Sequence, residues 1–325
     1  MATSTRDTRL TSGLGFALLS ASSFGLSGSL ARGLMDAGWS SAAAVVARIL
    51  LAAAVLVPIA LVQLRGRWSL VRRNLALIAG YGLIAVAGCQ LAYFNAVAHM
   101  QVGVALLIEY TAPVAVVGWL WLRHGQRPGW LIALGAAIGA TGLLLVLDLV
   151  SGAEVSPVGT GWALAAMAGV ACYFVLSSQE DNGLPATVLA AGGLLFGGAG
   201  LFLAGVLGIV PFAASAAPVA FAGFSVPWWG PVLTLGVVTA ALAYVAGIAA
   251  SRRLGSRLAS FVALFEVLAA LVFAWLLLGE SPHGIQFLGG VLIVVGVVVV
   301  KLGEGRRSIS QVEGTDLPRL QRNLR

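Results

Sequence analysis

Long apolar runs fill most of the chain, and short polar or glycine- and proline-bearing stretches separate them. Each run is close to the 20 or so residues that a helix needs to cross a hydrocarbon core of about 30 Å, and the runs lack the alternation of barrel strands. Only helices and closed barrels satisfy every backbone polar group in lipid. We therefore predict an all-α integral membrane protein with ten transmembrane helices, over residues 11–33, 41–63, 75–98, 102–122, 129–148, 159–179, 185–209, 228–250, 257–278 and 285–302.

Composition and charge agree with this pattern. The 325 residues are 59% hydrophobic and 10% charged, whereas a soluble domain has about a quarter charged residues. The net charge of +7 does not indicate nucleic acid as a partner, because the basic residues lie in the predicted loops and tails. With the N-terminus inside, all of them except Arg32 and Arg48 fall in or beside cytoplasmic loops or tails, as the positive-inside rule requires.

Lys301 is the single lysine among 19 basic residues, a usage typical of GC-rich bacterial genomes. We therefore expect a multi-pass protein of a bacterial plasma (inner) membrane with both termini in the cytoplasm. The two cysteines, Cys89 and Cys172, lie in apolar runs without metal-ligand or redox spacing. We interpret them as small lipid-buried residues.

Residues of the first half of the chain recur in the second half. At an offset of 154 residues, the positions Trp121, Gly125, Gly135 and Gly142 match Trp275, Gly279, Gly289 and Gly296. Five helices per half is an odd number, so the second half enters the membrane inverted. This arrangement is typical of secondary transporters, whose substrate site lies at mid-depth where the halves meet. The glycines predict close helix packing, either between the halves or between protomers.

The repeat divides the chain into segments. Residues 1–10 form a cytoplasmic tail, 11–148 the first repeat of five helices, 149–158 an outer linker, and 159–302 the second repeat. The cytoplasmic tail at 303–325 mixes both charges without an apolar face, which predicts disorder.

Several short stretches together resemble a known family. They are the run Phe273 to Glu280 with the preceding turn Arg252–Arg253, the start of the second predicted helix at Ala47–Arg48, and Ala112–Pro113 in the fourth. These stretches resemble the EamA-type drug/metabolite transporter superfamily over about residues 11–302. Two positions depart from the pattern, since Val267 stands where the family often has proline and Gln126 where the first repeat often has glutamate.

The resemblance implies a secondary transporter that exports small amphipathic metabolites by alternating access around a central cavity. Within the family the chain is most similar to exporters of neutral and aromatic amino acids. The alternative is a proton-coupled exporter of drugs or other metabolites. The partners expected are therefore a small-molecule substrate, the lipid bilayer and protons as candidate coupling ions; the oligomeric state stays open.

Three charged residues fall inside predicted helices and away from the helix ends, where a charge is costly and marks a functional candidate. Arg48 and Glu109 both lie about seven residues below the outer membrane boundary, roughly 10 Å deep, so we predict that they pair and could reach a substrate carboxylate. The alternatives are a purely structural bridge, or an Arg48 that extends to the headgroups. Glu266 lies near the midplane and is the candidate for proton coupling; the alternative is a neutral, hydrogen-bonded carboxyl.

Polar and aromatic residues on helix faces complete the predicted cavity. For the serines the competing interpretation is close helix packing. The residues are Ser20, Ser23 and Ser27 in the first helix, Gln90 and Tyr93 in the third, Trp162, Tyr173 and Ser177 in the sixth, and Tyr244 in the eighth. Pro113 removes a backbone hydrogen bond in the middle of the fourth helix and is predicted to form a hinge.

Other classes of protein fit the sequence less well. A membrane-embedded enzyme needs an acidic pair or a His/Glu cluster, but His99, His124 and His283 are scattered over three loops, and no Walker A or H-E-x-x-H motif is present. A scaffold or receptor needs neither charges inside the membrane nor inverted repeats. We expect no enzymatic activity, no cofactor and no metal.

Overall fold

The computed structural model describes residues 2–99, 105, 108–146, 156–179, 181–279, 281 and 283–322. The first half consists of helices, one of them a π-helix, η1. Its elements are α1 (Ala2–Asp36), α2 (Ser41–Leu64), α3 (Trp68–Arg73), α4 (Leu75–Gly80), η1 (Tyr81–Gly88), α5 (Cys89–His99), α7 (Ala112–His124) and α8 (Trp130–Val146).

The second half adds one short β-hairpin to its helices. Its elements are α9 (Pro157–Ser177), α10 (Ala186–Val206), β1 (Val219–Phe221), β2 (Phe224–Val226), α11 (Trp229–Gly236), η3 (Val237–Leu242), α12 (Ala243–Val262), α13 (Phe265–Phe273), η4 (Ala274–Leu278) and α14 (Gly284–Arg322).

The structure confirms a predominantly helical protein with several helices suited to crossing a membrane. In the part of the chain that is described, seven helices are long and apolar enough to cross a membrane, and three shorter apolar helices cover residues 112–123, 130–146 and 265–278. The count of ten crossings stays a prediction. One reason for the lower count is that residues 229–262 form a single long span, although Gly255 leaves the helical conformation inside it, with φ 77° and ψ 159°.

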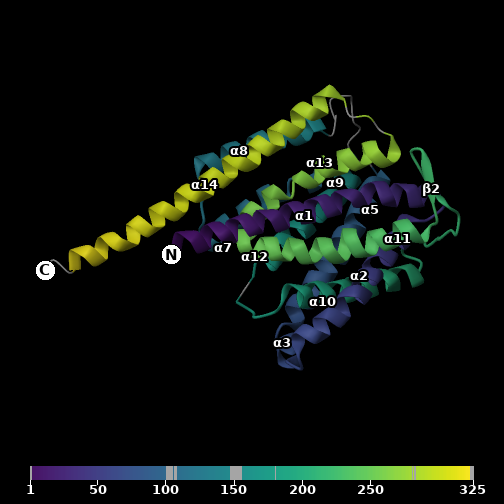
Figure 1. Ribbon diagram of the computed structural model, residues 1–325, viewed down its shortest axis with the longest axis horizontal. Coiled ribbons are helices and arrows are strands. Elements are labelled where there is room, and N and C mark those ends of the chain that lie inside the picture. Colours follow the sequence, from purple (N-terminus) through teal and green to yellow (C-terminus); the bar gives the residue numbers. More distant parts are fainter. Residues whose placement is uncertain are drawn as a thin grey trace.

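The helices run side by side, and the α8 and α14 pair lies along one edge of the bundle (Figure 1). The start of α1 and the C-terminal part of α14 lie at the end of the molecule opposite the hairpin (Figure 1). The hairpin covers the other end of α1, since Val219 and Leu34 belong to one buried cluster. It forms where the sequence indicated only an apolar loop, and Gly223 makes its turn at φ 84°.

Close backbone contact joins α8 and α14, and with them the two halves of the chain. A Cβ atom added at Gly142 would lie 2.6 Å from the carbonyl oxygen of Gly289. One added at Gly135 would lie 2.7 Å from the carbonyl oxygen of Gly296. Glycine is therefore required at this contact, because any side chain would force the helices apart.

The segments at the chain ends differ from the sequence prediction. Residues 2–10 and 303–322 are helical and continue α1 and α14, although the second stretch was predicted to be disordered. Extending a formed helix by one residue requires no new nucleus, which accounts for these continuations. In the predicted linker, residues 149–155 lie outside the described part, and α9 begins after Ser156, whose hydroxyl accepts a hydrogen bond from the Gly159 amide.

Irregular backbone occurs at matching places in the two halves. The π-helices η1 and η3 each interrupt an apolar helix, the predicted third and eighth. Turns at residues 110–111 and 263–264 interrupt the predicted fourth and ninth helices. Irregular backbone at membrane depth is tolerated where it is buried in protein or lines a cavity. These four places therefore indicate where a functional site lies.

Candidate functional site

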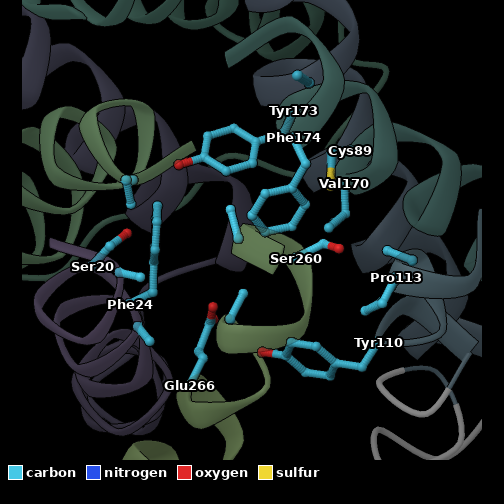
Figure 2. Close-up of a pocket in the computed structure, with 18 of the residues that line it drawn as sticks. Ser20, Phe24, Cys89, Tyr110, Pro113, Val170, Tyr173, Phe174, Ser260 and Glu266 are labelled. Atoms are coloured by element: carbon cyan, nitrogen blue, oxygen red, sulfur yellow. The ribbon is translucent and has the colours of Figure 1, made fainter. Parts of the chain in front are cut away.

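A cavity lies where the interrupted helices of the two halves meet, and we call it the central cavity. Its volume is about 120 Å³. Its walls come from α1, η1, α5, the turn before α7, α9, α12 and α13 (Figure 2). Polar groups reach it from both halves, including Ser20, Gln90, Glu109, Ser260 and Glu266.

Aromatic rings form one wall of the central cavity. Phe24 meets Tyr244 edge to face at 5.1 Å between ring centroids, and Tyr173 meets Phe174 in the same way at 4.9 Å. Tyr173 and Tyr244 are 5.9 Å apart, so the rings form one continuous cluster. Edge-to-face pairs of this kind are a favoured arrangement of aromatic rings. The cavity therefore presents a continuous aromatic surface.

Two carboxyl groups face the central cavity, and each lies beside one of the matching turns. Glu109 immediately precedes the turn at 110–111, and the Cys89 thiol lies 3.7 Å from its carboxyl oxygen Oε1. Glu266 follows the turn at 263–264 and lies in the first turn of α13. The Tyr110 hydroxyl points toward the Glu266 carboxyl (Figure 2) and interacts with it as a hydrogen-bonding partner.

A close helix contact fixes the position of Glu266. A Cβ added at Gly25 of α1 would lie 2.7 Å from the Glu266 carbonyl oxygen, so α1 packs directly on the start of α13. The Glu266 amide donates to the Ala263 carbonyl at 2.8 Å across the turn. A negative charge in the first turn of a helix is stabilised by the helix dipole. The turn thus places a carboxyl at the cavity and supports its charge.

The predicted pair of Arg48 and Glu109 does not form in this structure. Arg48 is 9% exposed, and its Nη2 donates to the Thr239 carbonyl at 2.7 Å. Its guanidinium also lies over the Phe24 ring, 5.5 Å from the centroid, and the carboxyl that interacts with its charge is Glu266. The prediction used depth alone, and depth does not determine which way a side chain turns around its helix.

Arg48 belongs to a second, smaller cavity, which we call the side pocket. Ser27, Gln90 and Tyr93 line it together with Arg48. Gln90 lines the central cavity as well. The polar residues predicted for one site are therefore divided between two neighbouring spaces.

The three serines of α1 have different environments. Ser20 lines the central cavity, and its hydroxyl donates to the Ala243 carbonyl at 2.8 Å. Ser23 is buried and is not among the residues that line the central cavity. Ser27 lines the side pocket. Their spacing of three and four residues places them near one face, but the helices that pack on α1 divide that face.

The α9 residues and the proline also differ in position. Tyr173 lines the central cavity. Trp162 is 39% exposed on the outside of α9, and Ser177 is fully buried away from the cavity. Pro113 lines the cavity in the first turn of α7, where a missing amide hydrogen costs nothing. The proline therefore follows a helix break and does not kink a continuous helix.

The sequence analysis missed several cavity residues. Phe24 lies four residues after Ser20, so the same argument about a helix face could have found it. Tyr110 could have been found because it is next to Glu109, which had been singled out as a charge inside a predicted helix. Phe174 and Ser260 carry no sequence signal that separates them from packing residues. Among the described residues, no group of three His, Cys, Asp or Glu side chains could hold a metal ion.

A multi-pass helical protein with matching interrupted helices around a polar and aromatic cavity has the architecture of a secondary transporter. The chain belongs to the EamA-like transporter family, which matches residues 11–148 and 157–302. This finding confirms the resemblance seen in the sequence, at the level of the family. The chain is therefore a multi-pass membrane transporter built from two copies of the family's domain.

Two comparisons agree with this assignment. The "Uncharacterized inner membrane transporter YicL" of Salmonella typhimurium is 23% identical over 297 residues, which cover 90% of this chain and 95% of that protein. A solved crystal structure matches with a TM-score of 0.72 at 22% identity, over 91% of this chain and 97% of that one. At this identity the solved structure supports the fold alone.

Proposed function

We propose that this transporter exports small amphipathic metabolites from a bacterial cell by alternating access, with neutral or aromatic amino acids as the first substrates to test. The observation that carries the proposal is the central cavity between the two halves, which is lined by both aromatic rings and polar groups. Sites for small molecules combine an apolar lining with a few polar groups in this way.

Alternating access requires that one half moves against the other around the substrate. The turns at 110–111 and 263–264 lie at matching places and touch the cavity. Residues at the ends of helical segments can absorb changes in φ and ψ. We infer that these turns are the hinges, with Pro113 limiting where α7 can begin.

Carboxyls at the cavity favour a second candidate, a proton-coupled exporter of drugs or other metabolites. Glu266 is the coupling residue in this version. Glu266→Gln then abolishes flux driven by a proton gradient but keeps substrate exchange in proteoliposomes. Unchanged gradient-driven flux in that variant removes Glu266 from the coupling mechanism.

A ligand screen on the purified full-length protein tests the main proposal. A ligand that binds only the folded state stabilises it by about 2.7 kcal/mol at 100 times its Kd. We expect at least one neutral or aromatic amino acid to raise the melting temperature. Counterflow of the labelled compound in proteoliposomes then separates transport from binding alone.

Two variants with the same kind of change locate the site. Tyr173→Leu removes a ring from the cavity wall, whereas Trp162→Leu removes one from the exposed side of α9. We expect the first variant to lose the ligand response and the second to keep it. Equal responses would place the ligand outside the central cavity.

The membrane orientation is part of the proposal. We expect both termini in the cytoplasm, because the basic residues concentrate in loops on that side. Cysteines introduced at residues 5 and 320 of the protein are labelled in intact cells and in opened cells. Comparison of the two measures the orientation of the termini. Label at either position in intact cells would contradict the orientation.

A further inference from the structure

The charges that line the central cavity are all of one sign. Glu109 and Glu266 both face it, and the charges of their carboxyls interact with each other. Among the described residues that line the cavity, there is no lysine, arginine or histidine. A charged ligand that enters this space therefore meets acidic side chains in the described lining, and Arg48, outside that lining, interacts with Glu266.

The Arg48 guanidinium, which contacts a residue of the cavity wall, is hydrogen-bonded elsewhere. Arg48 lines the side pocket, where its Nη2 donates to the Thr239 carbonyl at 2.7 Å. Phe24 lines the central cavity and also contacts the Arg48 guanidinium. To reach a ligand in the central cavity, Arg48 would have to give up a buried hydrogen bond and pass the Phe24 ring.

The rest of the lining suits a cation attached to an apolar body. The faces of Phe24, Tyr173 and Tyr244 can attract a cation, because an aromatic ring carries negative charge density on its faces. The Tyr173 side chain is only 8% exposed, and its hydroxyl interacts with the Ser20 hydroxyl as a hydrogen-bonding neighbour. It lies against Gly247, another residue of the cavity wall.

We propose that the central cavity recognises the ammonium group of its substrate and provides no cationic partner for a carboxylate. Amphipathic primary amines with an aromatic or apolar body then bind more tightly than the amino acids of the same skeleton. The inference rests on the proposed function in one respect, which is that the central cavity is the substrate site.

The physical reason is the cost of an unpaired charge. Glu266 interacts with the Arg48 charge, and an ammonium group beside Glu109 and Glu266 supplies a further opposite charge to these buried carboxyls. A substrate carboxylate in the same space would lose its water and meet two acidic groups. We expect a preference for the amine of roughly tenfold or more, since 1.4 kcal/mol already corresponds to tenfold.

Three ligands with one phenyl ring and the same two-carbon spacer isolate the charged groups. Phenethylamine carries only the ammonium, phenylalanine carries both charges, and 3-phenylpropionate carries only the carboxylate. The experiment measures the Kd of each for the full-length protein in detergent. We expect phenethylamine to bind most tightly, phenylalanine to bind roughly tenfold more weakly, and 3-phenylpropionate not to bind.

Variants of the two carboxyl residues test whether the carboxyls cause this order of ligand affinities. Glu109→Gln and Glu266→Gln keep the shape of each side chain and remove its charge. Each substitution should weaken the binding of phenethylamine by roughly tenfold. Trp162→Leu, on the exposed side of α9, is the control and should leave the Kd unchanged. The melting temperature without ligand shows that each variant is folded.

The outcomes separate the two proposals. The inference is overturned if 3-phenylpropionate binds as tightly as phenethylamine, if none of the three ligands binds, or if both Gln variants keep full affinity for the amine. Amine binding that depends on the carboxyls, without counterflow in proteoliposomes, supports the inference and contradicts the transport proposal. Counterflow of phenylalanine with no binding of phenethylamine supports transport and overturns the inference.

Discussion

The contact between α8 and α14 makes the effect of one methyl group predictable. A Cβ at Gly142 would lie 2.6 Å from the Gly289 carbonyl oxygen and 2.7 Å from the Ile293 backbone nitrogen, whereas ordinary contact begins at 3.4 Å. Both neighbouring atoms are backbone, so no side chain can turn away. The substitution Gly142→Ala must therefore open the contact locally by the 0.8 Å between 2.6 Å and 3.4 Å.

The energy of this opening can be bounded. A gap of about 0.5–1 Å forfeits roughly a quarter to a half of the dispersion energy of each contact, and overpacking a close contact costs about 1–3 kcal/mol. Alanine stabilises a helix by about 1 kcal/mol relative to glycine, which offsets part of this cost. We expect Gly142→Ala to lower the free energy of unfolding by up to about 2 kcal/mol.

A matched variant separates the effect of the α8–α14 contact from the effect of helix propensity. Gly118 lies in α7, and an added Cβ there meets nothing within 4 Å. Gly118→Ala should therefore raise stability by about 1 kcal/mol. Thermal unfolding of both variants in detergent, followed by tryptophan fluorescence, measures the difference. A rise in melting temperature for Gly142→Ala equal to that of Gly118→Ala would refute the packing argument.

Three further substitutions test the backbone, the cavity and the buried cation. Gly255 has φ 77° and ψ 159°, so Gly255→Ala should cost about 1–3 kcal/mol; an unchanged melting temperature would contradict that conformation. A Cβ at Gly247 would overlap the Tyr173 hydroxyl, and Gly247→Ala should weaken a cavity ligand by roughly 10–200-fold in a Kd titration; an unchanged Kd argues for another site. Arg48→Met loses a charge-assisted hydrogen bond to the Thr239 carbonyl, worth about 1.5–3 kcal/mol, but removes a buried charge whose desolvation costs several kcal/mol. Its melting temperature should hold or rise, and a drop of several degrees would show that the guanidinium stabilises the fold.

Local chemistry explains the parts of the site that could be predicted. Glu109 and Glu266 stood out because charges inside a membrane are costly, and the structure places both at the central cavity. Tyr173 was found because it shares a face of a predicted helix with other polar and aromatic residues, and Tyr244 because it recurs in the second half where the first half has Tyr93. Each of these signals can be read along the sequence without placing one helix against another.

Predictions that required two helices to be placed against each other were less successful. Arg48 was expected beside Glu109 but donates to the Thr239 carbonyl. Trp162 was expected in the cavity but is exposed on the outside of α9. In both cases the depth along the helix was estimated, while the direction around the helix axis was not.

The sequence by itself determined that this chain is a helical membrane protein made of two related halves, because lipid leaves the backbone no other way to satisfy its hydrogen bonds than helices or barrels. It also identified the intramembrane charges. Only the tertiary structure decided where the helices break, that the serines of α1 separate into three environments, and that the described lining of the central cavity holds two carboxyls and no Lys, Arg or His. These features depend on how each helix is rotated and packed against residues far away in sequence, and the periodicity of one helix does not contain that information.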